Sequence, residues 1–255
     1  MSKNKGPRFR PALAGVLSAA LLAAVPVGAE EVHDPLEPIN RTIYGLNELF
    51  DVMLLGPVAQ TYGELPRPLR TGVRNVLDNL RSPVTFVNDL LQGEFDRAGV
   101  TFARMFINST IGIFGLFDLA SEFGYPPHEE DFGQTLAVWG VGEGPFLMLP
   151  LLGPSTVRDA AGFVVDRAAF DPLARLGDTD IGAVRAIGET IDTRHRLDPV
   201  IRDLRRNSLD PYAAVRSAYL QRRAAEIRNR RPPAGERGYE AIFREEGDDD
   251  DAAAR

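Results

Sequence analysis

The sequence predicts a mainly α-helical single domain of amphipathic helices with one short glycine-rich hairpin or loop insertion. Three observations lead to this prediction. Apolar residues recur every three or four positions through most of the chain, which is the period of a helix with one apolar face. Neither an internal repeat nor an alternation of strand and helix patterns is visible. One segment, residues 132–149, loses the helical period and carries closely spaced glycines.

Residues 1–29 read as a secretory signal peptide. Basic residues at the start precede the apolar stretch PALAGVLSAALLAAVPVGA, which ends in the small residues Val27, Gly28 and Ala29. We expect cleavage near Ala29 and export to the periplasm. The sequence has no cysteine. The exported protein is therefore expected to use no disulfide and not to be a lipoprotein, because acylation of a mature N-terminus needs a cysteine.

Four helices are predicted in the first half of the chain. In the first, apolar residues follow a spacing of three and four from Leu36 to Met53, and Gly56-Pro57 is expected to stop the helix. The second is expected to turn Leu69 and Val73 inward. The second, third and fourth helices are expected at residues 66–80, 83–91 and 94–109, with Gly93 ending the third.

Two apolar segments that contain glycine fit no helix well. IGIFGLFDLA, residues 111–120, is expected to be a loop or a short buried turn because glycine is a poor helix former. In residues 132–149, FGQTLAVWGVGEGPFLML, the glycines Gly140, Gly142 and Gly144 indicate a hairpin or an irregular loop. These three glycines form either a mobile loop or tight turns that need a positive φ.

The run GPFLMLPLLGP at residues 144–154 needs an apolar cover. Pro150 prevents a continuous helix, and the run is shorter than the about 20 residues that span a bilayer as a helix. Left in water, its six large apolar side chains forgo about 9–18 kcal/mol in total. The cover is either the core of the protein or lipid.

Helices are predicted to return after this run. Ser155 or Thr156 is expected to cap a helix that runs to about Ala168. Further helices are expected at residues 181–193, 199–206 and 211–230, so the helical domain is expected to span residues 30–231. The remaining residues, 232–255, form an acidic tail that we expect to be disordered.

Charge is unevenly distributed along the chain. The net charge is −7, yet residues 194–231 hold eleven arginines against four acidic residues. Such a basic segment either presents a solvated helix face or contacts phosphate or an acidic partner. Arg216, Arg222 and Arg223 are expected on a polar surface that meets a partner or a headgroup.

No catalytic, metal or nucleotide site is predicted. The histidines His33, His128 and His195 lie far apart, and HEED at 128–131 lacks the second histidine of a zinc-binding helix. The sequence around Ser155 is not the nucleophile turn of esterases. We therefore expect no enzyme activity, cofactor, metal or nucleic-acid partner. A phospholipase-like enzyme remains the least supported alternative.

Several long segments resemble the VacJ/MlaA family. The segment DPLEPINRTIYGLNELFD opens the resemblance at residue 34. It is followed by NDLLQGEF, FARMFINSTIGIFGLFD, FGQTLAVWGVGEGPFLMLPLLGPSTVRD and DPYAAVRSAYLQRR, so that the resemblance covers residues 34–223. It implies a ring of helices around an amphipathic channel, embedded in the inner leaflet of the outer membrane at its periplasmic face.

The resemblance also implies a function and partners. The protein is expected to be a passive conduit that removes mislocalised phospholipid from the outer leaflet and hands it to a soluble periplasmic carrier. An outer-membrane porin trimer is the other expected partner. This sequence departs from the usual family pattern, because it has no cysteine to acylate. A soluble periplasmic lipid-binding or scaffold protein is therefore the alternative.

Two sets of residues are expected along the lipid path. On the first helix, Asn40, Tyr44 and Asn47 form a polar stripe that either bonds to neighbouring helices or lines the path for a headgroup. Trp139 is expected either in the core or at the membrane interface, where tryptophan is common. The apolar wall of the path is expected to include Phe146, Leu147, Met148 and Leu149.

Overall fold

The computed structural model describes residues 34–172 and 179–228, which belong to a compact unit that begins at Asp34. The expectations for the signal peptide and the acidic tail fall outside these residues. In chain order the elements are α1 (Glu37–Phe50), η1 (Asp51–Leu55), α2 (Gly56–Gly63), α3 (Arg67–Gln92), α4 (Phe95–Thr110), α5 (Leu119–Glu122), α6 (Phe132–Val138), β1 (Phe146–Leu149), β2 (Gly153–Thr156), α7 (Val157–Val165), η2 (Asp166–Phe170), α9 (Thr179–Asn207) and α10 (Pro211–Ile227).

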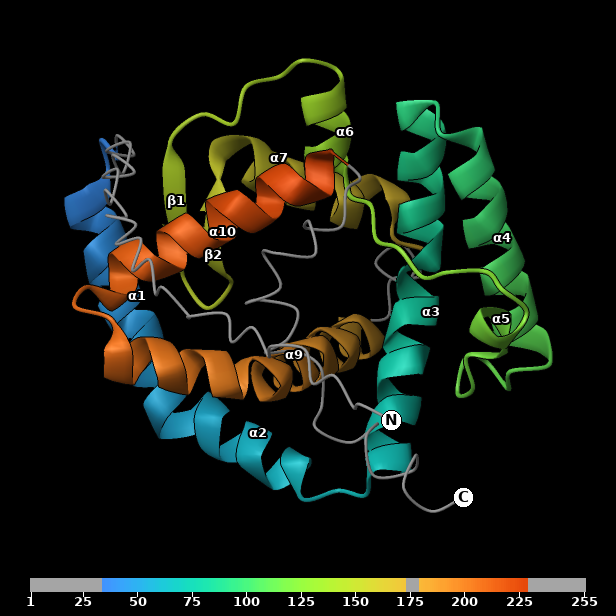
Figure 1. Cartoon of the computed structure of the whole chain (residues 1–255), viewed down its shortest axis with the longest axis horizontal. Helices are drawn as coiled ribbons and strands as arrows, with labels where there is room; N and C mark the ends of the chain where they lie inside the picture. The colour runs from blue at the N-terminus through green and yellow to red at the C-terminus, as the bar shows by residue number, and fades with distance from the viewer. Residues whose placement is uncertain (1–33, 173–178, 229–255) are drawn as a thin grey trace, which may run out of the picture. The chain divides into compact units, whose positions relative to one another are not determined.

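The predicted fold class is confirmed: the unit is mainly helical, with one small hairpin. Contacts between its elements close on themselves (Figure 1). From α1 the circuit passes through β1, β2, α7, α6, α3, α9 and α2, and η1 returns it to α1. Helices α4 and α5 lie on the side of α3 away from α9 (Figure 1).

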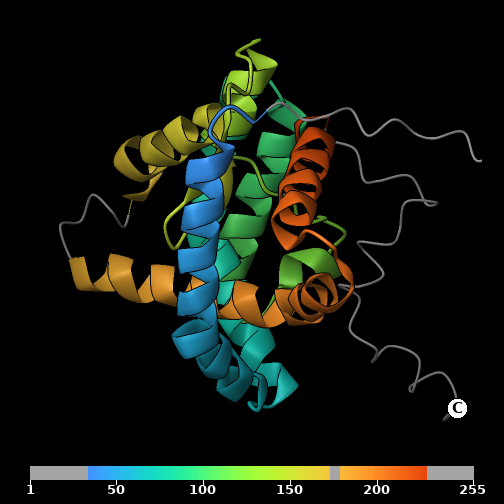
Figure 2. The same ribbon diagram turned by 90° about the vertical axis from the view of Figure 1, so that its left-hand side faces the viewer.

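The hairpin and α10 complete the unit. Strands β1 and β2 pair antiparallel, with Phe146 opposite Thr156 and Leu149 opposite Gly153. Helix α10 contacts β2, α6 and α9, so that it bridges the hairpin and the long helix α9. Seen from the side, α9 passes behind α1 (Figure 2). The hairpin is therefore held between the first and the last described helices.

Three expected helix boundaries at proline are wrong. Gly56-Pro57 does not stop the first helix, because the π-helical turn η1 precedes it and places Pro57 in the first turn of α2, where no N–H is needed. Pro83 lies inside α3, and Pro199 lies inside α9. Packing of these long helices against several neighbours outweighs the local cost of each proline.

Residues 132–156 differ from the expectation in part. The hairpin is present, but residues 132–138 form helix α6, because the Asp131 side chain accepts a hydrogen bond from the N–H of Gln134 and caps it. Thr156 caps α7 as expected, whereas Pro154 and Ser155 belong to β2 rather than to the helix. Helix α7 ends at Val165 and continues as the π-helical turn η2.

The interior of the unit is unusually polar. Among the described residues, buried polar and charged side chains outnumber buried apolar ones, and Asn88, Asp89 and Thr135 are fully buried. The apolar core cluster is small: Phe146, Met148 and Tyr212, with partly buried neighbours from α1 and α10. Large soluble domains bury mainly apolar side chains, so this interior is inverted relative to them.

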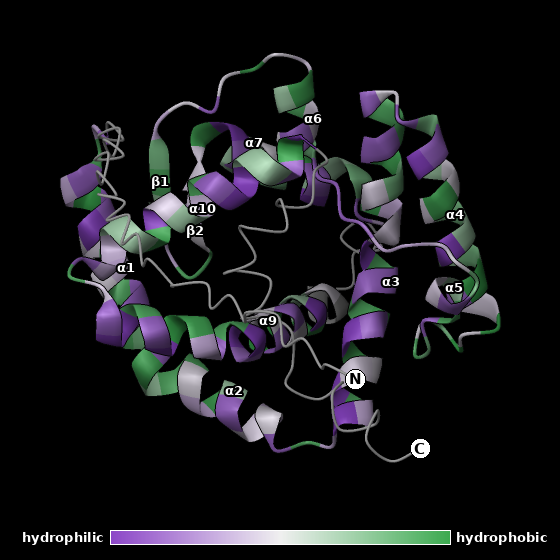
Figure 3. Ribbon diagram, in the orientation of Figure 1, coloured by the Kyte–Doolittle hydropathy of each residue, from purple (hydrophilic) through white to green (hydrophobic). Residues whose placement is uncertain are grey.

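Large apolar side chains are instead exposed on the surface of the unit. Leu69 and Val73, expected to point inward, are exposed, because the opposite face of α3 carries the polar residues that are buried. Figure 3 shows hydrophilic and hydrophobic bands alternating along α3 and α9. None of the described helices combines the length and the hydropathy that crossing a membrane requires. The exposed apolar side chains on α1, η1 and α4 include Ile39, Leu46, Leu49, Val52, Met53, Leu54, Phe95, Phe102 and Phe106.

Candidate functional site

Two asparagines of α1 hold the hairpin by its backbone. The Nδ2 of Asn40 donates to the carbonyl oxygen of Phe146 at 3.0 Å, and its Oδ1 accepts from the N–H of Met148 at 2.9 Å. Asn47, two helical turns further, bonds to the carbonyl oxygen of Leu149 and the N–H of Leu151, both at 2.9 Å. We call these four hydrogen bonds the asparagine clamp. It supplies partners to backbone groups that a two-stranded sheet leaves unpaired.

The clamp answers one question that the sequence left open. Asn40 is buried and its amide is occupied by the hairpin backbone, and Asn47 makes equivalent bonds. The partner is thus a strand, neither a neighbouring helix nor an open path. Tyr44, between them, lies edge-on to Tyr212 with ring centroids 5.9 Å apart. Burial, with the nearby Glu48 carboxylate adding to it, raises the pKa of Tyr44 to about 12.

The apolar run of the hairpin is covered on one side by the protein's own core. Phe146 and Met148 are each 3% exposed and pack against Tyr212 of α10. Leu147 and Leu149 alternate with them and are partly exposed. At the turn, Leu151 and Leu152 are 61% and 60% exposed. The core therefore covers half of the strand residues and leaves the turn uncovered.

The three glycines of the preceding loop have different roles. Gly140 ends α6 with φ of 88°, and its N–H donates to the carbonyl oxygen of Ala137. Gly144 has φ of 68°, and a Cβ there would lie 3.2 Å from Val157 Cβ. Gly142 shows neither a positive φ nor a neighbour within 4 Å of an added Cβ. Turn geometry thus explains two of the three glycines, and mobility remains a proposal that concerns Gly142.

Trp139 lies at the end of α6 and not in the core. Its side chain is 53% exposed, and its Nε1 donates to the carbonyl oxygen of Leu91 at 3.0 Å. Its ring meets Phe132 edge-on at 5.7 Å. Of the two alternatives from the sequence, the core position is therefore wrong.

The basic residues of α10 do not form one exposed surface. Arg223 is buried and donates to Asp131 at 2.6 and 2.7 Å and to Asp159 at 3.1 Å. These carboxylates lie at the first turns of α6 and α7, where they also cap or support helix starts. Burial opposes the ionisation of Asp131 and Asp159, but their bonds hold the pKa of each below its usual value. The expected surface position of Arg223 is wrong.

Arg216 is also drawn inward, whereas Arg222 is exposed. The Arg216 Nη1 lies 3.3 Å from Asp34, and its guanidinium stacks over the Tyr212 ring at 5.6 Å. Arg222 pairs with Glu226 one turn along the exposed face of α10. Of the three expected residues, Arg222 is the one left on a solvent-facing surface.

Asp34 joins the start of the unit to its last described helix. Its carboxylate accepts hydrogen bonds from Tyr212, from Asn40 at 3.1 Å and from Arg216. Burial opposes the ionisation of Asp34, but these bonds together hold its pKa below the usual value. The first described residue is therefore bonded to α10, the last described helix.

Arginine–carboxylate pairs also fix the circuit from inside. Asp51, at the start of η1, receives bonds from Arg194 at 2.5 and 3.0 Å and from Arg205 at 2.6 Å, both on α9. Asp166, in η2, accepts from the N–H of Phe132 and from Asn88 Nδ2, both at 2.9 Å. Burial raises the pKa of Asp166 to about 6. These polar contacts hold the elements of the circuit together, as an apolar core does in other domains.

Sequence reasoning missed most of this interior network. An arginine that pairs with a buried carboxylate looks, in the sequence, like any arginine on a solvated helix. The sequence does carry a compositional signal. It combines many arginines and many aspartates with more apolar residues than a small core would hold. No cluster of metal-binding side chains occurs among residues 34–172 and 179–228.

Comparison with known proteins gives a consistent result. A family model described as MlaA lipoprotein matches residues 32–226. The intermembrane phospholipid transport system lipoprotein MlaA of Escherichia coli is 37% identical over 196 residues, which cover 74% of this chain and 76% of that relative. An uncharacterized protein of Rickettsia felis is 36% identical over 203 residues, covering 78% and 80%.

One solved structure matches the fold as well. It was reported under the heading "Structural basis for maintenance of bacterial outer membrane lipid asymmetry". The alignment has a TM-score of 0.69 at 36% sequence identity and covers 76% of this chain and 99% of that one. The similarity thus extends over nearly the whole of the solved chain.

Proposed function

Because this chain belongs to the MlaA lipoprotein family, we propose that it is a passive outer-membrane conduit for phospholipid. Its function is intermembrane phospholipid transport, in which it removes mislocalised phospholipid from the outer leaflet. Members of this family are components of a lipid-transport system. The observation that carries the proposal is the inverted distribution of side chains, with charged residues buried and large apolar residues exposed.

The inversion suits a protein that lies in lipid and handles a headgroup. Exposed phenylalanines on α4 and apolar side chains on α1 and η1 match the acyl region of a leaflet. A headgroup moving through that region needs polar partners, because an unpaired charge in a low-dielectric setting is costly. The closed circuit of elements supports a path on its inner side, in keeping with the ring around an amphipathic channel that the family resemblance implies.

The exposed apolar side chains also provide a means of membrane attachment. The Escherichia coli relative is named a lipoprotein, whereas this sequence has no cysteine to carry an acyl chain. One acyl chain gives only marginal membrane binding, so a large buried apolar surface can replace it. We assign attachment to the exposed apolar residues, on the periplasmic face of the outer membrane. Trp139, exposed beside this surface, fits an interfacial anchor.

Two protein partners complete the proposal. A porin trimer would hold the conduit in the outer membrane, and a soluble periplasmic carrier would take up the lipid that it delivers. Arg222 is exposed on α10 and suits a contact with an acidic carrier. Arg216 and Arg223 support that helix from within. Gly142 is the part of the loop that suits a mobile gate beside the hairpin.

The proposal is tested in cells that lack the gene. A membrane-impermeant amine reagent should label more phospholipid at their surface than in the parent, and the wild-type gene should restore the low level. A variant with Phe102→Asp and Phe106→Asp should fold but leave the outer-membrane fraction. Recovery of the wild-type protein wholly in the soluble fraction would instead support a soluble lipid-binding or scaffold protein.

A further inference from the structure

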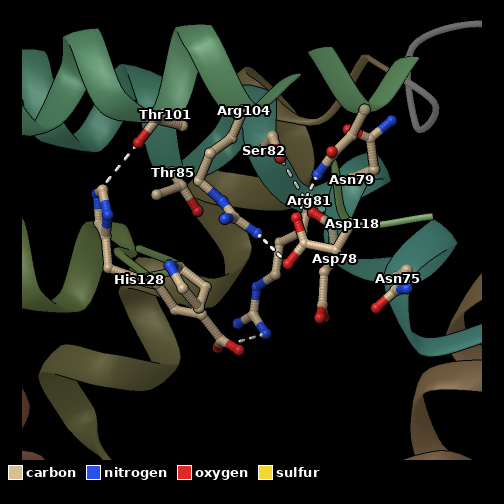
Figure 4. Close-up of a pocket in the computed structure, with 13 residues that line it drawn as sticks. Asn75, Asp78, Asn79, Arg81, Ser82, Thr85, Thr101, Arg104, Asp118 and His128 are labelled. Carbon is tan, nitrogen blue, oxygen red and sulfur yellow. Dashed lines mark hydrogen bonds and ion pairs between the residues drawn. The ribbon is translucent and has the colours of Figure 1, made fainter. Parts of the chain in front are cut away.

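A polar cavity lies between α3, α4 and the segment before α6 (Figure 4). Its volume is about 70 Å³. Aspartates, asparagines and arginines line it, together with Glu129 and His128, and no phenylalanine, tyrosine or tryptophan is among the lining residues. Most small-molecule pockets are lined by apolar side chains. This one is built for a polar ligand.

The cavity holds both signs of charge. The Arg81 Nη1 lies 3.0 Å from a carboxylate oxygen of Glu129, and the Arg104 Nη2 lies 3.0 Å from one of Asp118. Asp78 is different: within the described part of the chain its carboxylate has neither an ion pair nor a hydrogen bond. Figure 4 shows the side chains of Asp78 and Arg81 extending toward the same side of the cavity. The Asp78 carboxylate is therefore unpaired among these residues, although it lies near Arg81, which is itself paired with Glu129.

A second polar group in the lining also has no partner. Asn79 donates through Nδ2 to Ser109 Oγ at 2.9 Å, but its Oδ1 is buried without a hydrogen bond among the described residues. Buried acceptors are normally satisfied, so such an atom points to a missing donor. Because the Asn79 Oδ1 is closed off inside the lining, the acceptor left open to a ligand is the neighbouring Asp78 carboxylate.

Charged groups of α9 act on the lining of the cavity across α3. Asp78 interacts electrostatically with Glu129 and with Arg196 of α9, and Arg81 interacts with Glu129 and with Glu189 of α9. Helix α9 packs on the side of α3 opposite α4 (Figure 1). The free carboxylate of Asp78 is therefore within electrostatic reach of α9, which belongs to the circuit that the proposed function places around the phospholipid path.

We propose that this cavity binds the headgroup of an aminophospholipid, with a primary ammonium at the Asp78 carboxylate and the phosphodiester at Arg81 and Arg104. The inference rests on the proposed function and adds its substrate class. A primary ammonium has three N–H donors, which match carboxylate oxygens. A guanidinium bonds well to phosphate oxygens.

Other common headgroups fit the cavity less well. A quaternary ammonium has no N–H to donate and is usually held by aromatic rings, which the lining lacks. A glycerol headgroup keeps the negative phosphate but brings no cation to the Asp78 carboxylate. The cavity should therefore prefer ethanolamine over choline and glycerol headgroups.

The ionisation of Asp78 agrees with this assignment. Burial by the surrounding protein, with Glu129 adding to it, raises the pKa of Asp78 to about 6, while Arg196, Arg81 and Arg74 act in the opposite direction. The carboxylate is thus mainly charged at neutral pH. It is nevertheless more costly to keep charged than an ordinary aspartate, which favours a cation beside it.

Lipid competition tests the proposal. The full chain is reconstituted in nanodiscs with equal phosphatidylethanolamine, phosphatidylcholine and phosphatidylglycerol, and the lipids that remain bound after delipidation are counted by mass spectrometry. We expect ethanolamine lipid to be enriched in the wild type. Asp78→Asn should lower its ratio to glycerol lipid about tenfold, the effect of one charge-assisted hydrogen bond. Glu64→Gln, which removes an exposed carboxylate at the end of α2, should leave the ratio unchanged.

Further arms separate the possible failures. An Asp78→Glu variant should keep the preference, which excludes a mere folding defect. A wild type that binds phospholipid without headgroup preference would overturn this inference and leave the proposed function standing. A wild type that retains no phospholipid would overturn both. Soluble glycerophosphoethanolamine, titrated against the nanodisc, should compete weakly; binding as tight as that of the lipid would assign the site to a free headgroup instead.

Discussion

Two apolar segments punctuated by glycine look alike in the sequence and behave differently in the structure. The hairpin (residues 146–156) places Phe146 and Met148 in the core and is bonded through its backbone to Asn40 and Asn47. The turn between α4 and α5 (residues 111–117) exposes its apolar side chains instead, and Phe114 is 80% exposed. The difference comes from partners elsewhere in the chain: the hairpin has the asparagine clamp and α10, and the turn has no such cover.

The turn between α4 and α5 is strained in its backbone and is held in place by hydrogen bonds. Ile113 and Phe114 both have a positive φ, at 54° and 56°, which is costly for bulky residues. The N–H of Gly115 donates to the carbonyl oxygen of Asn108 at 2.7 Å, and Asn108 in turn bonds to Asp118. A strained turn that is held in place to expose phenylalanine agrees with a surface that meets lipid.

The largest effect on the hairpin side is expected from Arg223. Arg223→Ala removes the buried cation between Asp131 and Asp159, leaves Asp131 without an ion pair among the described residues and Asp159 with Arg158 and Tyr219 only, and should lower the free energy of unfolding by about 3–5 kcal/mol. The neighbouring Arg222→Ala removes an exposed charge and should change it by less than about 0.5 kcal/mol. Denaturant titration followed by circular dichroism measures both. Equal effects would mean that α10 does not support the hairpin through Arg223.

The next-largest loss of stability is expected from changes in the asparagine clamp. Asn40→Ala leaves the N–H of Met148 and the carbonyl of Phe146 unpaired in a buried place, so we expect a loss of about 3 kcal/mol. Asn47→Ala affects backbone groups nearer to solvent, and a loss of about 1 kcal/mol is expected. The same denaturant titration applies. A larger loss for Asn47→Ala than for Asn40→Ala would contradict the assignment of the clamp's buried end.

A pH-dependent effect is expected from Asp166, which supports the start of α6 beneath the hairpin loop. Its pKa is raised to about 6, so folding favours the protonated form, and its contribution to stability falls as pH rises from about 4 to above 6. Asp166→Asn removes this titration. Relative to wild type, the variant should therefore gain about 2 kcal/mol between pH 4 and pH 7. A stability difference that is constant over this range, measured by thermal unfolding, would refute the assignment.

Glycine substitutions compare the two segments directly, and one of them, Gly142→Ala, is expected to have the smallest effect on stability. Gly115 has φ of 90°, and a Cβ there would lie 2.6 Å from Asn79 Cβ, so Gly115→Ala should cost about 2 kcal/mol or more. Gly142→Ala meets nothing within 4 Å and should change stability by less than about 1 kcal/mol. If Gly142→Ala nevertheless slows lipid transport, the loop needs its freedom of motion. Unchanged transport would remove Gly142 from the proposed gate.

The sequence predicted the class of fold and the segments that matter, but not which way they face. Helical periodicity located α1 and α4 within a few residues, because spacing alone sets an amphipathic helix. Periodicity cannot say which face is buried. Leu69 and Val73 were therefore placed inward, although the polar face of α3 is the one that packs.

The candidate site was harder to predict for a related reason. Asn40 and Asn47 were recognised as a stripe, but their partner lies about 100 residues away in the chain and could not be read from spacing. Arg223 looked like a surface cation because its two aspartates come from other helices. Asp78 and Arg81 went unnoticed, since a cavity between two helices has no signature in one of them.

The central claim is that the outside of this unit contacts the acyl chains of the membrane, whereas its inner side is a polar, water-accessible surface. The absence of native cysteine allows single-cysteine labelling with a fluorophore in reconstituted membranes. Brominated acyl chains should quench the probe at Phe106→Cys and Phe114→Cys but spare it at Arg81→Cys, where an aqueous quencher should act instead. Aqueous quenching at Phe106→Cys and Phe114→Cys equal to that at Arg81→Cys would contradict the account.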